Sequence, residues 1–110
     1  MKIKKEKKEI EISDCYIKRL SLLGMARGLM FRKKEKSPIL LFEFNKCTKE
    51  PIHSFFVFFP FLALWLDDDN NIIEKRIVYP WKKFISPSTR FSKLLEIPLN
   101  SCFEEIVKKF

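Results

Sequence analysis

Histidine and cysteine are the residues here whose chemistry would most readily support nucleophilic or acid–base catalysis. His53 is the only histidine, and Cys47 lies six residues before it. A Cys–His pair across a loop would activate a thiolate, but the sequence shows no orienting acid or oxyanion hole for it. His53 either binds an anion, shuttles a proton or makes a structural hydrogen bond at the start of a strand. We predict no catalytic residues.

Metal-ligating residues are present but are not arranged in a metal-binding pattern. Cys15, Cys47 and Cys102 together with His53 would supply four ligands, yet no two cysteines are spaced as in a zinc knuckle. Asp67–Asp69 lacks the alternating acids and later glutamate of a calcium loop. We predict no metal and no other cofactor. The odd, dispersed cysteines argue against a disulfide framework and favour a cytoplasmic location.

Aromatic and basic residues in expected loops are better candidates for a binding site. Arg32 would form paired hydrogen bonds with a carboxylate or phosphate, and Trp81 would provide an apolar wall. In the alternative interpretation, Phe31 and Trp81 close the ends of a barrel and Arg32 pairs with a local acid. The candidate binding residues are Met30, Phe31, Arg32, His53 and Trp81.

Positive charge is concentrated in the first third of the chain, which has a net charge of +8 overall. Residues 1–36 hold twelve Lys or Arg and five Asp or Glu, whereas residues 37–110 hold ten and nine. A basic segment of this kind either contacts nucleic acid or an anionic surface, or keeps a Phe-rich protein in solution. We favour the second interpretation, because the basic residues lack interleaved aromatic residues for base stacking.

No membrane segment is expected. Phe55–Leu66 is apolar throughout, but its twelve residues are too few to span a bilayer as a helix. Pro60 would also interrupt a helix there. The amino-terminal residues are highly charged and contain no apolar stretch of a secretory signal.

Hydrophobic periodicity predicts a mainly β fold in one domain over residues 1–110, with about six strands and two short helices. Residues 101–110 would form the carboxy-terminal helix, with Ser101 and Glu104 as a capping box. The other helix is expected at residues 17–28, with Ile17, Leu20 and Leu23 on one face and Gly28 at its end. The expected strands are Lys2–Ser13, Ile39–Phe44, Ile52–Phe59, Phe61–Leu66, Ile72–Val78 and Phe91–Ile97, the last of which also fits a helix by its period. Loops or turns are expected at Asn45–Pro51, Asp67–Asn71 and Tyr79–Ser88.

Five short motifs in order carry a resemblance to a known family. They are Arg27-Gly28-Leu29-Met30-Phe31-Arg32, Ile52-His53-Ser54-Phe55-Phe56-Val57-Phe58-Phe59-Pro60, Leu64-Trp65-Leu66-Asp67, Pro80-Trp81-Lys82 and Leu95-Glu96-Ile97-Pro98. Together they resemble Domain of Unknown Function 192, also called Uncharacterised Protein Family 0127, over about residues 10–100. The His-Ser-Phe-Phe and Pro-Trp-Lys forms are most similar to archaeal members.

The resemblance implies a compact β-sandwich or barrel-like fold with a minor helical part, and it implies that Phe91–Ile97 is a strand. Relatives often carry an acid where Leu62 stands, and a small residue and glycine where Leu99 and Asn100 stand. A site that uses this acid in relatives would therefore be lacking here.

The family has no established activity. We expect a non-catalytic binding module for a small anionic ligand or a peptide, with a small molecule or a protein as partner. A nucleic-acid-associated accessory protein is the alternative, and an enzyme of unknown reaction is the third interpretation.

Overall fold

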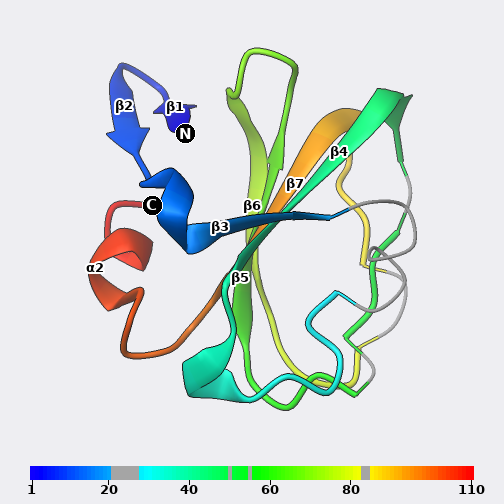
Figure 1. Cartoon of the computed structure of the whole chain (residues 1–110). Coiled ribbons are helices and arrows are strands. Elements are labelled where there is room, and N and C mark those ends of the chain that lie inside the picture. Colours follow the sequence, from blue (N-terminus) through cyan, green and yellow to red (C-terminus); the bar gives the residue numbers. More distant parts are fainter. Residues whose placement is uncertain (21–27, 50, 55, 83–84) are drawn as a thin grey trace.

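The structure is a computed structural model that describes residues 1–20, 28–49, 51–54, 56–82 and 85–110, with only the backbone of residues 45 and 46. These residues form a two-stranded and a five-stranded sheet, so the mainly β prediction is confirmed (Figure 1). The strands are β1 (Lys2–Lys5), β2 (Lys8–Glu11), β3 (Ile17–Leu20), β4 (Ile39–Thr48), β5 (Phe61–Leu66), β6 (Ile72–Val78) and β7 (Phe91–Pro98). The short helices are the 3₁₀ turns η1 (Asp14–Tyr16) and η2 (Lys34–Lys36) and the α-helix α2 (Glu104–Val107).

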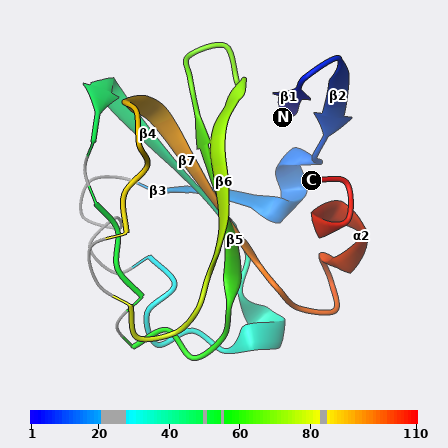
Figure 2. The same cartoon turned by 180° about the vertical axis from the view of Figure 1, so that it is seen from behind.

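The five-stranded sheet has the order β3-β4-β7-β5-β6, with β7 at its centre (Figure 2). Neighbouring strands are antiparallel except β3 and β4, which are parallel. Every residue of β5 is buried, because side chains of both alternating sets are covered. The central strands therefore have an apolar layer on each side.

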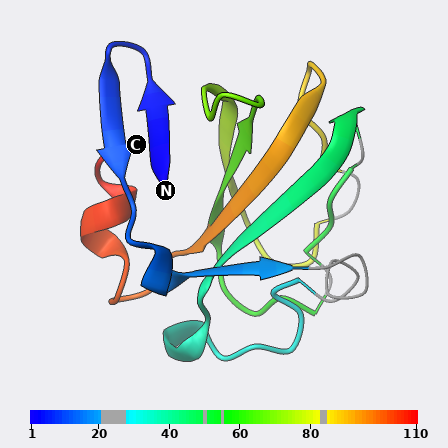
Figure 3. The same cartoon turned by 45° about the horizontal axis from the view of Figure 1, so that its top comes forward.

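One side of the sheet, the hairpin-covered face, packs against the β1–β2 hairpin and α2. Its strand residues include Leu41, Leu64 and Leu95, which share a core cluster with Ile3 of the hairpin and Phe103 beside α2. Figure 3 shows the hairpin and α2 together at one side of the sheet. Regular elements thus cover this face.

The opposite side, the loop-covered face, packs against segments with little regular structure. Strand residues Leu40, Ala63 and Leu94 share a core cluster with Leu29 and Val57, which lie in the covering loops. In Figure 3 these loops lie on the side of the sheet away from the hairpin. Among the described residues, no helix is long and apolar enough to cross a membrane.

The predictions for β5, β6 and β7 are confirmed, and two predictions near the amino terminus are wrong. Residues 2–13 form a hairpin instead of one strand, because the chain turns at Glu6 and pairs Ile3 with Ile10. Ile17–Leu20 is the strand β3 instead of the start of a helix, because it pairs with β4. Residues 21–27 of the expected helix lie outside the described residues.

Two predictions in the middle of the chain are also wrong. The expected loop at 45–51 starts later, since β4 extends to Thr48. The expected strand Ile52–Phe59 is irregular over its described residues, and Ile52 makes a single bridge with Ile85. A left-handed backbone at Phe56 (φ 59°) is incompatible with a continuing strand.

The carboxy-terminal helix is present but short, and the capping box is not formed. Phe103 is the N-cap residue of α2, with no side-chain cap. The hydroxyl of Ser101 instead donates to Glu35, and Asn100 Oδ1 accepts a hydrogen bond from the Phe103 amide at 3.2 Å. The sequence pattern assigns Ser101 to the helix cap, but its hydroxyl contacts η2 instead.

Candidate binding surface

Four exposed aromatic side chains form a continuous patch over the loop-covered face, which we call the aromatic surface: Phe31, Phe56, Phe58 and Trp81. Phe31 and Phe56 are stacked with their ring centroids 5.0 Å apart. Phe56 and Phe58 each meet Trp81 edge to face, at 5.0 Å and 6.0 Å. Between 42% and 59% of each residue is exposed to solvent. Large aromatic residues that remain exposed together are typical of interaction sites.

The loops that carry these rings are joined through Ser54, which is fully buried. The Ser54 amide donates to the Lys82 carbonyl at 2.7 Å, and the Trp81 amide donates to the Ser54 carbonyl at 2.9 Å. The Ser54 hydroxyl donates to the Tyr79 carbonyl at 2.6 Å and accepts from the Lys82 amide at 2.7 Å. The Phe31 amide donates to the Phe56 carbonyl at 2.9 Å. Backbone hydrogen bonds therefore fix all three loops to one another.

Three of the four aromatic residues have a left-handed backbone, with φ of 61° at Phe31, 59° at Phe56 and 65° at Trp81. Such a conformation is unfavourable for a bulky residue, at a cost of about 1–3 kcal/mol each. Strain of this kind persists where surrounding contacts impose it and is concentrated at binding and catalytic sites. The rings of these three residues are exposed and contact one another.

The loop segments that carry or adjoin the aromatic surface are basic in sequence. Residues 28–33, 51–54, 56–60 and 79–82 contain Arg32, Lys33 and Lys82 but no Asp or Glu. Arg32 is half-buried, and its Nε donates to the Gly28 carbonyl at 3.0 Å. His53 is exposed, one residue before Ser54. The surface therefore combines an apolar centre with basic loops.

The structure brings together part of the predicted site. Phe31 and Trp81 are joined by Phe56, which the sequence prediction did not include. Met30 is partly buried and packs against the core of the loop-covered face. Phe31 and Trp81 are 58% and 50% exposed, so they do not close a barrel as interior side chains. One feature of the sequence could have indicated that Phe56 and Phe58 are exposed: they alternate with Val57 and Phe59, which are buried.

A buried acid lies beneath these loops and was missed from the sequence. Glu96 is at the centre of β7, opposite Leu40 of β4 and Ala63 of β5, and is only 5% exposed. Burial raises the pKa of its carboxyl to about 8. A Cβ built on Gly28 would lie 3.8 Å from Glu96 Oε1, so the carboxyl reaches the covering loop. The available signal was an acid within the apolar run of a strand buried on both faces.

A second buried polar group lies on the same face. Trp65 is a diagonal neighbour of Glu96, since Ala63 pairs with Glu96 and Trp65 with Leu94. In the described part of the chain, Trp65 Nε1 has no hydrogen-bond partner. Buried polar groups normally have partners, and exceptions call for a specific explanation. The loop-covered face thus differs from an ordinary apolar core.

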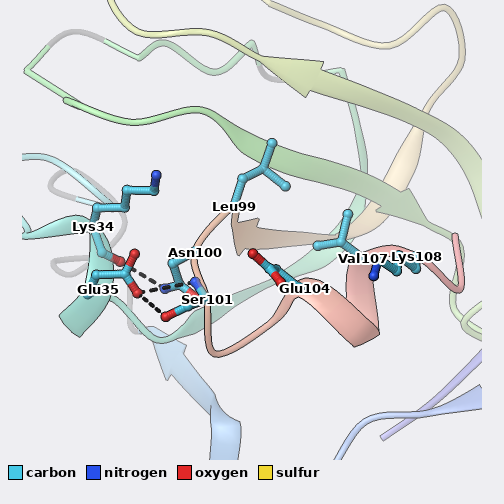
Figure 4. A pocket seen from close by; sticks show the side chains of 8 residues that line it. All are labelled: Lys34, Glu35, Leu99, Asn100, Ser101, Glu104, Val107 and Lys108. Carbon is cyan, nitrogen blue, oxygen red and sulfur yellow. Dashed lines mark hydrogen bonds between the residues drawn. The ribbon is translucent and has the colours of Figure 1, made fainter.

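A cavity of about 320 Å³ lies elsewhere, between η2 and the segment that joins β7 to α2 (Figure 4). The Asn100 side-chain amide donates to the Lys34 carbonyl at 2.8 Å, and the Ser101 amide donates to Glu35 at 3.1 Å. Hydrogen bonds from Ser101 lower the pKa of Glu35. The polar groups here bind one another and connect two elements, which gives the lining a structural role.

Among the described residues, no group of three His, Cys, Asp or Glu side chains converges. Cys47 Sγ lies 3.6 Å from Ser92 Oγ on β7. The basic hairpin places Lys2 opposite Glu11 and Lys4 opposite Glu9, which compensates part of its charge. The aromatic surface is therefore the strongest candidate site.

Comparison with known proteins finds chains that are similar to this one. No family model matches it. A protein of known structure from Novosphingobium aromaticivorans, described as of unknown function, superposes with a TM-score of 0.65 at 16% identity. The match covers 83% of this chain and 66% of that protein, so the chain spans slightly less than two thirds of its length, and the likeness shows the fold.

A protein from Pyrococcus horikoshii named as a UPF0127 protein is 28% identical over 90 residues, which are 82% of this chain and 72% of that relative. The similarity extends over most of the segment that carries the five motifs. It confirms the resemblance found in the sequence: the chain is similar to a protein of Uncharacterised Protein Family 0127.

Proposed function

We propose that this protein is a non-catalytic binding module that takes up an acidic peptide segment of a partner protein at the aromatic surface. The observation that carries the proposal is the set of four mutually contacting, exposed rings of Phe31, Phe56, Phe58 and Trp81. Aromatic residues, Trp and Tyr above all, are enriched in the energetically dominant parts of protein interfaces. Because loop-to-loop hydrogen bonds hold the rings in place, little entropy would be lost when a partner binds.

The charge of the loops supports an acidic partner. Arg32, Lys33 and Lys82 lie in residues 28–33, 51–54, 56–60 and 79–82, which contain no Asp or Glu. Positive charge around an apolar centre speeds the approach of acidic segments and disfavours basic ones. An apolar residue of the peptide would contact the rings, and its carboxylates would face the basic residues.

A peptide fits the surface better than single-stranded nucleic acid does. Bases stack on the free faces of separate aromatic rings along a basic groove. Here Phe31 and Phe56 stack on each other, and Trp81 meets Phe56 and Phe58 edge to face. The rings therefore offer one joint apolar surface, and nucleic acid is the competing outcome of the test.

The test uses two pools of fluorescein-labelled decapeptides, both with random Leu, Phe and Tyr, one with interspersed Asp and Glu and the other with Lys and Arg. Fluorescence anisotropy should show binding of the acidic pool and none of the basic pool. Phe56→Ala and Trp81→Ala should each weaken acidic-pool binding at least about tenfold, or ~1.4 kcal/mol. Ile77→Ala is the matched control, because Ile77 is 45% exposed on β6 and lies outside the aromatic surface.

Two results would overturn the proposal. Equal binding of the acidic and basic pools would show that the basic loops do not select an acidic partner. Unchanged binding by both aromatic variants would show that the peptide does not bind at the aromatic surface. Displacement of bound peptide by polyuridylate, with tighter binding of the polyuridylate itself, would assign the surface to nucleic acid instead.

A further inference from the structure

The contact between Glu96 and the covering loops gives this face a second property. Glu96 lies on the central strand, flanked on its face by Leu40 and Ala63, and its Oε1 is directed toward Gly28. Gly28 begins the loop that continues to Arg32 and carries Phe31. The carboxyl is thus held between the sheet and the segment that presents part of the aromatic surface.

The surroundings of this carboxyl favour its neutral form. The sheet residues beside it are apolar, and burial raises its pKa to about 8. No hydrogen bond from a described residue compensates a negative charge on it. An ionised Glu96 would therefore require water or a donor to reach it.

The charged groups around Glu96 lie at the margins of this face. Arg32, on the loop, directs its Nε to the Gly28 carbonyl. Arg76 of β6 lies over the Trp65 ring, 5.7 Å from its centre, and also pairs with Glu74 at 2.6 Å. His53 and Lys82 on the covering loops are exposed to solvent. From β4, Leu40 and Phe42 contribute no charge on this side.

The loop from Gly28 to Arg32 is held by fewer backbone hydrogen bonds than the strands beneath it. Strands β4 and β5 hold Glu96 by antiparallel pairing on both sides of β7. The loop is joined to its neighbour by the Phe31–Phe56 backbone bond and has a left-handed backbone at Gly28 and Phe31. Segments with few such bonds open locally at a lower free energy than sheet strands do.

We propose that Glu96 is a proton-controlled latch: in its neutral form it keeps residues 28–32 packed on the sheet, and loss of its proton releases this segment and rearranges the aromatic surface. The latch is independent of what the surface binds. It makes the surface a closed, ordered site at acidic pH and an increasingly open one as the pH rises toward 8.

The test follows Trp65, which lies beneath the loops and is fully buried. Trp81→Phe leaves Trp65 as the only tryptophan, since the chain has two. Acrylamide quenching of Trp65 is then measured from pH 5 to pH 10, with far-ultraviolet circular dichroism as a check that the fold persists. We expect quenching to rise with pH and to level off above about pH 8, because the opening constant grows up to tenfold per pH unit between the ordinary carboxyl pKa of 4.5 in the open form and the raised pKa of about 8 in the packed form.

Glu96→Gln in the same background keeps the shape of the neutral acid and should abolish the rise. Glu43→Gln is the matched control, because Glu43 is exposed on β4, and it should leave the rise unchanged. Hydrogen exchange of the Phe31 amide in the unmodified protein gives a second measurement, with faster opening expected over the same pH range. A pH-independent signal, a rise that persists in Glu96→Gln, or loss of the whole fold in step with quenching would each overturn the latch. No peptide is present, so the result is separate from that of the peptide-binding test.

Discussion

The two faces of the five-stranded sheet are covered in different ways. The hairpin-covered face packs apolar strand residues against a hairpin and a helix, and left-handed residues on that side, Glu6 and Asn70, lie in turns. The loop-covered face holds Glu96, the unpaired Trp65 indole nitrogen and three strained aromatic residues. Buried polar groups and backbone strain reduce stability, so their concentration on one face indicates that this face serves binding while the other supports the fold.

The largest effect should come from the hairpin-covered face. Leu64 is fully buried there, and Leu64→Ala should lower the free energy of unfolding by about 3 kcal/mol through lost burial and a cavity. Urea denaturation measures this loss. The folded variant should retain the emission spectrum of Trp81 and its peptide binding. If peptide binding falls as much as stability, the two faces are not separate in role.

A smaller effect should separate strain from contact on the loop-covered face. Phe56→Gly and Phe56→Ala both remove the ring, but only glycine adopts a φ of 59° without steric cost. The glycine variant should therefore be more stable than the alanine variant by about 1 kcal/mol, measured by denaturation. Ile77→Gly against Ile77→Ala in the extended strand β6 is the control and should show the opposite order. A lower stability for Phe56→Gly than for Phe56→Ala would mean that the backbone there is not strained.

The smallest effect concerns the contact between η2 and the segment before α2. Ser101→Ala removes the hydroxyl donor to Glu35, so the lowered pKa of Glu35 should rise toward its ordinary value. A lowered carboxyl pKa gives stability that is present above the ordinary value and is lost as the pH falls through the folded value. The variant should therefore lose less stability on acidification. Carboxyl chemical shifts followed by NMR titration measure the change, and an unchanged Glu35 titration would show that the contact is absent in solution.

The strands that the sequence predicts well are those whose pattern is local. Phe61–Leu66 and Ile72–Val78 flank the turn at Asp67, whose carboxylate accepts the amides of Asp69 and Asn71 at 2.9 Å. Here apolar runs and turn chemistry indicate the same hairpin. Phe91–Ile97 is ambiguous by period alone. The family resemblance predicts a strand there, and the structure confirms it.

The failures arise where partners distant in sequence decide the structure. Ile17 and Leu20 fit a helical face, but pairing with β4 extends them. The apolar stretch around Val57 fits a strand, but its backbone hydrogen bonds go to neighbouring loops instead of a strand partner. Short apolar patterns do not specify these partners.

The candidate site was predicted in part for the same reason. Phe31 and Trp81 stand out in loops, whereas Phe56 is hidden within an apolar run that resembles core. Glu96 was overlooked because an acid in a strand usually faces solvent, and only the sheet order shows that β7 is central and covered on both sides.

The hydrogen bonds of Ser54 have an evolutionary consequence. They join the loops through backbone groups and a single hydroxyl. The course of the loop backbone therefore depends little on the side chains of the neighbouring residues. The rings at Phe56, Phe58 and Trp81 are therefore free to change identity while the loops keep their course. Related proteins with a serine at this position would be able to diverge in what they recognise without redesigning the scaffold, as antibody loops do on a constant framework.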